Sequence, residues 1–248
     1  MTVTPQGRTR RAAPRIAMCA LVVAGTVALS GCGGDADPDA GTNGVGRLSA
    51  AKIQTKTRTA ADAAGAVRLS GTVVAAGRTY TLDMQLKDDG GTGSVTAKGS
   101  AFKLVRIGKE LYLKADAAFW KHAGGGGSAT ADKLGGKYVK VPQDDPVYKK
   151  FSGFTDKGVL LGGLLPLHGK LATDGHHEAS GVRTVRITGD HGSGGTLDVS
   201  LEGKPYPLRL VRGGHAGTLS FSDWGKDFAL KEPAGDDTVD YGQQLPSS

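Results

Sequence analysis

Apolar and polar residues alternate along much of the chain, which is typical of β-strands that bury one face. The alternation is clearest over residues 78–86 and 196–202. The apolar members of these two runs are Tyr80, Leu82, Met84, Leu86, Leu197, Val199 and Leu201. Further strands are predicted at residues 67–75, 94–98, 102–107, 111–114, 137–141, 182–188, 207–211 and 218–221. Because the connections are short turns such as Ala76-Gly77, we expect neighbouring strands to pair antiparallel.

A helical spacing of apolar residues appears in only a few places. Ser49 can cap a helix that begins near Ala50, with one stripe formed by Ile53, Thr57, Ala60, Ala61 and Ala64. Residues 117–134 cannot be helical throughout, because they contain four consecutive glycines at 124–127. Short helices are predicted at 146–151 and 159–165, and Pro166 ends the second. The sum of these elements predicts an α+β domain with one large, highly curved antiparallel sheet.

The first 32 residues have the features of an export signal. Four arginines and no acidic residue precede an uncharged segment at 16–29, which is too short to span a bilayer as a helix. The next residues complete a lipobox formed by Leu29, Ser30, Gly31 and Cys32. In this interpretation Cys32 receives a diacylglycerol and becomes the first residue of the mature protein. The alternative is an ordinary signal peptide with a chance cysteine.

These features predict four segments. Residues 1–31 are a lipoprotein signal peptide, and residues 32–47 are a lipidated, flexible tether with almost nothing to bury. Residues 48–240 form the folded domain, and residues 241–248 form a disordered tail. The expected location is the extracytoplasmic face of the cell membrane, where the N-terminal lipid provides the anchor.

Removal of the signal peptide changes the charge and the cysteine content. The mature part has 27 basic and 24 acidic residues, so its net charge is +3 rather than the +7 of the whole chain. This mild balance does not favour a nucleic-acid partner, which requires clustered Lys and Arg. The only cysteines are Cys19, lost with the signal peptide, and Cys32, used for lipidation, so the domain has no disulfide.

Sequence patterns of catalysis are not found. The chain has no Gly-x-Ser-x-Gly elbow and no Gly-rich phosphate loop, and lipidation leaves no free thiol. His176-His177-Glu178 is the one cluster of metal-ligand types, but adjacent histidines on an extended segment point in opposite directions. We interpret it as a solvated loop. We therefore expect no enzyme activity, no metal and no cofactor.

Several short motifs, taken in order, resemble a known family of lipoproteins. They follow the lipobox and the first helix, and they are Ser70-Gly71-Thr72, Leu111-Tyr112-Leu113-Lys114, Phe119-Trp120, Lys204-Pro205-Tyr206-Pro207 and Phe221-Ser222-Asp223-Trp224. This order is similar to the LppX/LprG-type lipoproteins of the actinobacterial cell envelope, whose fold is similar to that of LolA and LolB. The resemblance covers nearly all of residues 48–240. It implies a half-barrel sheet with helices over its concave face, around an apolar cavity that takes the acyl chains of a lipid or glycolipid. It implies no catalytic residues.

The candidate lining of such a cavity comes from the apolar faces of strands and helices. These positions are Tyr80, Leu82, Met84, Leu86, Leu104, Leu111, Leu113, Leu160, Leu161, Leu164, Leu197, Val199 and Leu201. A filled core and an open cavity require the same side chains, so the sequence leaves both open. With a cavity, the protein binds or carries lipid, and the headgroup could contact Lys103, Arg106 or Lys109. With a solid core, it is a surface module that binds another protein.

Overall fold

The computed structural model describes residues 37–123 and 128–240. The predicted signal peptide, the lipobox at Leu29–Cys32, the start of the tether and the tail at 241–248 lie outside the described residues. Residues 37–248 form a compact unit of their own, and every described strand and every residue of the hydrophobic core belongs to it. We therefore expect this segment to fold independently.

The strands form two successive antiparallel meanders. The first consists of β1 (Ala66–Ala75), β2 (Arg78–Lys87), β3 (Gly90–Ala97), β4 (Ser100–Ile107), β5 (Glu110–Lys114) and β6 (Tyr138–Val141). The second consists of β7 (Leu171–Ala179), β8 (Val182–Gly189), β9 (Thr196–Ser200), β10 (Pro207–Val211) and β11 (Thr218–Ser222). Each strand pairs with the next one in its meander. The connections are short turns or loops, as predicted, except between β5 and β6, where residues 115–137 intervene.

Two-residue turns fix the register of three of these hairpins. Ala76-Gly77, Lys98-Gly99 and Ser180-Gly181 have positive φ at both positions, between 48° and 79°. This is the type I′ conformation, whose twist matches that of paired strands. Glycine at the second position adopts it without steric cost, so these turns define where β1–β2, β3–β4 and β7–β8 reverse.

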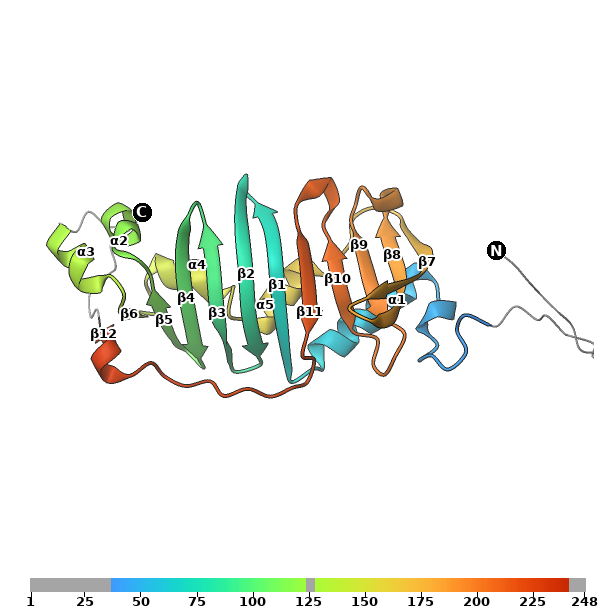
Figure 1. The fold of residues 1–248 in the computed structure, drawn as a ribbon, viewed down its shortest axis with the longest axis horizontal. Coiled ribbons are helices and arrows are strands. Elements are labelled where there is room, and N and C mark those ends of the chain that lie inside the picture. Colours follow the sequence, from blue (N-terminus) through green and yellow to red (C-terminus); the bar gives the residue numbers. More distant parts are fainter. Residues whose placement is uncertain (1–36, 124–127, 241–248) are drawn as a thin grey trace, which may run out of the picture. The chain divides into compact units, whose positions relative to one another are not determined.

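One long-range pair joins the two meanders into a single sheet. The first strand, β1, pairs antiparallel with β11, and Leu69 lies opposite Phe221. The described strand order is β12-β6-β5-β4-β3-β2-β1-β11-β10-β9-β8-β7, and the sheet is open at both edges (Figure 1). The short β12 (Thr238–Asp240) runs parallel to β6, so the sheet is mostly rather than entirely antiparallel. The predicted α+β class with one large antiparallel sheet is confirmed.

Three helices cover one face of the sheet. In Figure 1, α1 (Ala50–Asp62), α4 (Pro146–Ser152) and α5 (Lys157–Leu164) lie behind the strands, with α4 and α5 across the first meander. The predicted stripe of α1 is buried at Ile53, Thr57 and Ala61. The predicted break within residues 117–134 is also present, since α2 (Ala117–Ala123) and α3 (Ser128–Leu134) are separate helices. Among the described residues, no helix combines the length and apolar character needed to cross a membrane.

Residues 37–47 differ from the predicted flexible tether. The side-chain amide of Asn43 donates to the carbonyl oxygens of Ser200 (2.9 Å) and Gly203 (3.2 Å), and Val45 is buried in the core. A short 3-10 turn, η1 (Val45–Arg47), then leads into α1. The prediction of an unstructured segment is wrong here because one asparagine and one valine are enough to fix a chain that is otherwise polar.

The segment after β11 is extended. Trp224 is half-buried: its indole stacks on Tyr206 (centroids 4.8 Å apart, planes at 4°) and donates to the carbonyl of Pro207 at 3.0 Å. The chain then runs along one margin of the sheet to β12 (Figure 1). Lys87 holds it there through Asp227, at 2.6 Å, and through the ring of Phe228. The hydrogen bond from Lys87 also lowers the pKa of Asp227 below its ordinary value.

Candidate functional site

A large hollow of the helix-covered face lies between the hairpin end of β2–β4 and helix α4. Its volume is about 570 Å³, within the range of sites that bind small molecules. The apolar part of its lining is Tyr80, Val95, Ala97, Phe102, Phe119, Phe151 and Phe154. The polar part consists of Arg78, Lys98, Ser100 and Lys150. The lining is therefore mainly aromatic, with cations at the end where the hairpins turn.

A second hollow of about 360 Å³ adjoins the first, because Tyr80, Lys150 and Phe154 line both. It lies between β1–β2 and helix α5. The remaining lining is Val73, Ala75, Leu82, Gly153, Val159, Leu160, Gly163, Leu164 and Arg212. Val159 is 64% exposed and is the only large apolar side chain of the described residues that is so exposed. The two hollows are hereafter called the paired hollows.

A row of aromatic rings forms the wall between them and the core. Ring centroids are 4.8 Å apart for Phe102–Phe119, 5.5 Å for Phe102–Phe151 and 6.5 Å for Phe151–Phe154. Tyr80 continues the row, with its centroid 6.0 Å from that of Phe154. Rings at these separations are in mutual contact, so the wall is mainly apolar, and the hydroxyl of Tyr80 is its one hydrogen-bonding group.

A buried arginine holds the loop between α4 and α5. Arg106 extends from β4 and donates to Thr155 Oγ1 (3.1 Å), to the Thr155 carbonyl (2.9 Å) and to the Gly108 carbonyl (2.7 Å). Its Nη2 also lies 3.5 Å from Asp156 Oδ2. These charge-assisted contacts fix the loop at one point, and α4 and α5 are placed over the sheet on either side of it.

A buried lysine fixes the start of α5. Lys157 is 4% exposed, and its ammonium lies 2.6 Å from Asp88 Oδ1 in the β2–β3 turn. The same group donates to the carbonyls of Asp62 and Ala64 at the end of α1. Asp156 caps α5 by accepting from the Val159 amide at 2.9 Å. The helix that bounds the second hollow is therefore tied to α1 and to the sheet.

The structure places the predicted lining residues in two groups. Tyr80, Leu82, Leu160 and Leu164 line the paired hollows. The other nine are buried in the hydrophobic core and line neither hollow; they are Met84, Leu86, Leu104, Leu111, Leu113, Leu161, Leu197, Val199 and Leu201. Most of the predicted positions therefore belong to the buried core, and the paired hollows lie at the hairpin end of the first meander.

The predicted headgroup contacts do not lie at these hollows. Lys103 lies on the opposite face of the sheet, Arg106 is engaged by the α4–α5 loop, and Lys109 lies in the β4–β5 turn. The cations that do line the hollows are Arg78, Lys98, Lys150 and Arg212. Sequence reasoning missed them because three flank hairpin turns, and turn positions are commonly polar whatever their function.

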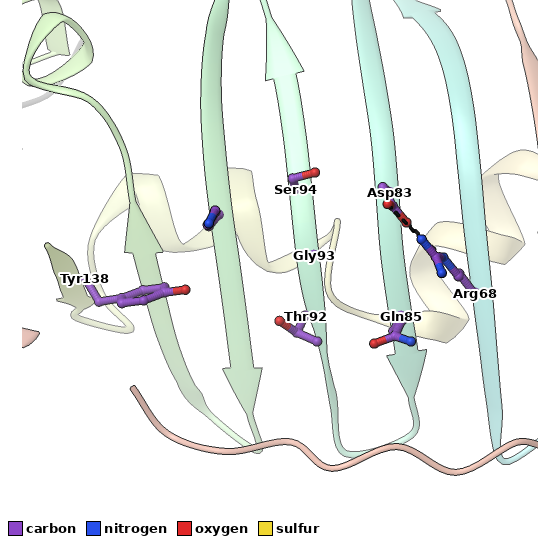
Figure 2. A pocket seen from close by; sticks show the side chains of 8 residues that line it. Arg68, Asp83, Gln85, Thr92, Gly93, Ser94 and Tyr138 are labelled. Atoms are coloured by element: carbon purple, nitrogen blue, oxygen red, sulfur yellow. Dashed lines mark hydrogen bonds and ion pairs between the residues drawn. The ribbon is translucent and has the colours of Figure 1, made fainter. Parts of the chain in front are cut away.

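The face without helices has a shallow polar hollow of about 330 Å³. Figure 2 shows its side chains on β1–β4 and β6, among them Arg68, Asp83 and Tyr138. Arg68 donates to both carboxylate oxygens of Asp83, at 3.1 and 3.0 Å, and this hydrogen bonding raises the pKa of Arg68. Burial raises the pKa of Tyr138. Arg68 and Asp83 are paired with each other, Tyr138 has the ammonium of Lys114 over its ring, and these groups do not form an arrangement of nucleophile and base.

The histidine cluster is part of a strand rather than a loop. His176, His177 and Glu178 belong to the edge strand β7. His177 Nε2 lies 2.7 Å from the Asp174 carbonyl, and His176 Nε2 lies 3.0 Å from Asp39 Oδ1. The prediction of a loop is wrong because an edge strand with both sides in water lacks apolar alternation. Within the described residues, no group of three His, Cys, Asp or Glu side chains could hold a metal ion.

Comparison with solved structures identifies proteins of the same fold. LprF from Mycobacterium bovis is 17% identical, with a TM-score of 0.52 over 75% of this chain and 97% of LprF. The lipoprotein LppX from Mycobacterium tuberculosis is 16% identical, with a TM-score of 0.43 over 73% of this chain and 97% of LppX. The likeness to LprF shows the fold. No protein-family model and no curated protein matches the sequence.

Proposed function

We propose that this protein is a lipoprotein, anchored through Cys32 to the extracytoplasmic face of the cell membrane, that binds the acyl chains of a lipid in the paired hollows. The single observation that carries the proposal is the continuity of the two hollows, which share Tyr80, Lys150 and Phe154 and have mainly apolar walls. An extended apolar chain fits a continuous apolar surface of this kind better than a compact polar ligand does.

The energetics favour such a ligand. Each methylene group removed from water contributes about 0.8 kcal/mol, so a chain that lies along both hollows gains several kilocalories per mole. The exposed Val159 and the half-buried Tyr80, Phe154 and Leu160 would lose contact with water at the same time.

The sequence of the first 32 residues supports the proposed location, and the similarity in fold to LprF agrees with it. A lipid-anchored protein operates beside a bilayer, where amphiphiles are available. The shared fold supports the proposal without supplying the ligand, because one fold can serve several functions.

Native mass spectrometry of the segment 37–248 tests the proposal. The segment is purified without detergent from cells, and its mass is compared before and after organic extraction. The proposal predicts a co-purifying species with the mass of a lipid that extraction removes. A protein without bound lipid, which also fails to bind a fluorescent fatty acid, would instead support a surface module with a solid core.

A further inference from the structure

The paired hollows have a strongly one-sided charge at their mouth. Arg78, Lys98, Lys150 and Arg212 line them, and none of the described residues in their lining is acidic. Three of these cations come from the same margin of the sheet: Arg78 begins β2, Lys98 lies in the β3–β4 turn, and Arg212 follows β10. Figure 1 shows these hairpin ends side by side, at the margin opposite the extended C-terminal segment.

These four cations also lack partners. Among the described residues, their side chains form no ion pair and no hydrogen bond. Lys150 lies over the ring of Phe151, 5.9 Å from its centroid, and has no other such contact. Elsewhere in the domain, cations such as Arg68, Lys87 and Arg186 are matched by carboxylates. Other exposed cations, such as Lys52 and Arg209, also have no carboxylate partner within the described segments; the four differ in lining apolar hollows whose described lining has no acidic residue.

Arg212 gives an independent sign of a missing partner. Its Nε is buried from water and has no hydrogen-bond acceptor. When a charged side chain has a buried N–H donor with no hydrogen-bond acceptor, the folded state is destabilised. Such unsatisfied donors are rare in native structures. An anion at the mouth of the second hollow would supply acceptor oxygens to this guanidinium, whose planar donors suit phosphate and carboxylate.

We propose that these four cations recognise the anionic headgroup, a phosphate or carboxylate, of an amphiphile whose acyl chain lies in the paired hollows. This inference rests on the proposed function and adds the charge class of the ligand. The headgroup lies at the hairpin margin, where Lys150 and Arg212 contact it, and the chain extends toward Tyr80 and Phe154. Neutral amphiphiles with the same chain bind more weakly, because they leave the cations unmatched.

Calorimetric titration of the segment 37–248 tests this inference with three probes below their micellar concentrations. Dodecyl phosphate has both chain and charge, dodecyl maltoside has the chain alone, and inorganic phosphate has the charge alone. The variant Lys150→Gln/Arg212→Gln removes two of the four cations. The control Lys149→Gln/Lys103→Gln removes the same net charge at positions that do not line the hollows.

The expected result is that dodecyl phosphate binds about tenfold or more tightly than dodecyl maltoside, a difference of about 1.4 kcal/mol. The double variant should lose most of this preference, while its affinity for the maltoside and its melting temperature stay close to those of the parent. The control should keep the preference. Because the contacts are electrostatic, the preference should also decrease as salt is added.

Three results would overturn the inference, and they are distinguishable. Equal binding of the two amphiphiles would remove the headgroup claim and leave the proposed function intact. Binding of neither amphiphile would remove the proposed function as well. Inorganic phosphate bound as tightly as dodecyl phosphate would show a site for free anions that does not require an acyl chain.

Discussion

Two buried cations hold the helices over the sheet, and each does so through carbonyl oxygens as well as carboxylates. Arg106 holds the α4–α5 loop, and Lys157 holds the start of α5 against α1. A buried charge is tolerated only where its donors are satisfied, so these two residues specify one position for the helical layer. The shape of the paired hollows depends on that position.

The variant Arg106→Met tests this role. It keeps much of the apolar length of the side chain and leaves the carbonyls of Thr155 and Gly108 without their donors. We expect a loss of about 3 kcal/mol in the free energy of unfolding, measured in urea, because buried acceptors lose charge-assisted hydrogen bonds. The control is Lys103→Met, on the same strand but on the open face. We expect this variant to change the free energy of unfolding by less than about 0.5 kcal/mol. Equal effects of the two substitutions would mean that Arg106 does not hold the loop.

The roles of single residues were the least predictable from sequence. Arg106 and Lys103 are both cations of β4 and looked equivalent, yet one is buried and the other lies on the open face. The strand alternation separates their faces, but the partners of Arg106 come from residues 155 and 156, about fifty positions away. Local patterns do not contain such information.

At the scale of elements, helix α5 has buried leucines on one side and two exposed glycines on the other. Leu161 and Leu164 are buried, whereas Gly162 and Gly163 are exposed. A Cβ placed at either glycine would meet no other atom within 4 Å. The glycines are therefore not required by close packing, although each weakens the helix relative to alanine.

Gly162→Ala should raise the stability of the domain. Neither the backbone conformation nor the surroundings of Gly162 oppose a methyl group, so the gain should approach the difference in helix propensity, about 0.8 kcal/mol. Chemical denaturation of the variant and of the parent gives the difference directly. A loss of stability would show that Gly162 has a structural role that its open surroundings do not reveal.

The type and order of elements were largely predictable, because alternation and turn residues are local signals. The strand β7 was missed, since an edge strand exposed on both sides has no alternation, and its histidines were interpreted as a loop. The pairing of β1 with β11 joins residues about 150 positions apart, and no local pattern predicts which strands meet at that distance.

For the whole molecule, the sequence predicted the correct kind of sheet but could not locate the open space. Leu82 on β2 and Leu104 on β4 both belong to the helix-covered apolar face of the sheet, yet Leu82 borders a hollow and Leu104 is buried in the core and lines neither hollow. Along the strands, Leu82 is level with Phe102, whereas Leu104 is level with Met84, one step farther from the hairpin turns. The apolar pattern is the same at both levels, so it does not show which one borders open space.

Attachment to the membrane is a separate property, which depends on residues outside the described part of the chain. Cys32→Ala removes the proposed site of lipidation. In cell fractionation we expect the variant to remain uncleaved or to leave the membrane, because stable anchoring requires at least two acyl chains. A variant that is processed and membrane-bound as before would contradict the proposed anchor, without affecting the claim about the hollows.

The central claim is that an acyl chain lies in the paired hollows, and two neighbouring glycines allow a matched test. Gly163 lines the second hollow and Gly162 does not, although both are exposed on α5 with free space around them. A phenylalanine at either position has the same helix propensity and the same added volume. Only the one at 163 would fill the hollow.

The decisive measurement is the affinity of the segment 37–248 for dodecyl maltoside in the variants Gly163→Phe and Gly162→Phe. The account predicts that Gly163→Phe weakens binding about tenfold or more, while Gly162→Phe binds as the parent does and both variants melt at similar temperatures. Undiminished binding by Gly163→Phe, or the same loss in both variants, would contradict the claim that the ligand occupies these hollows.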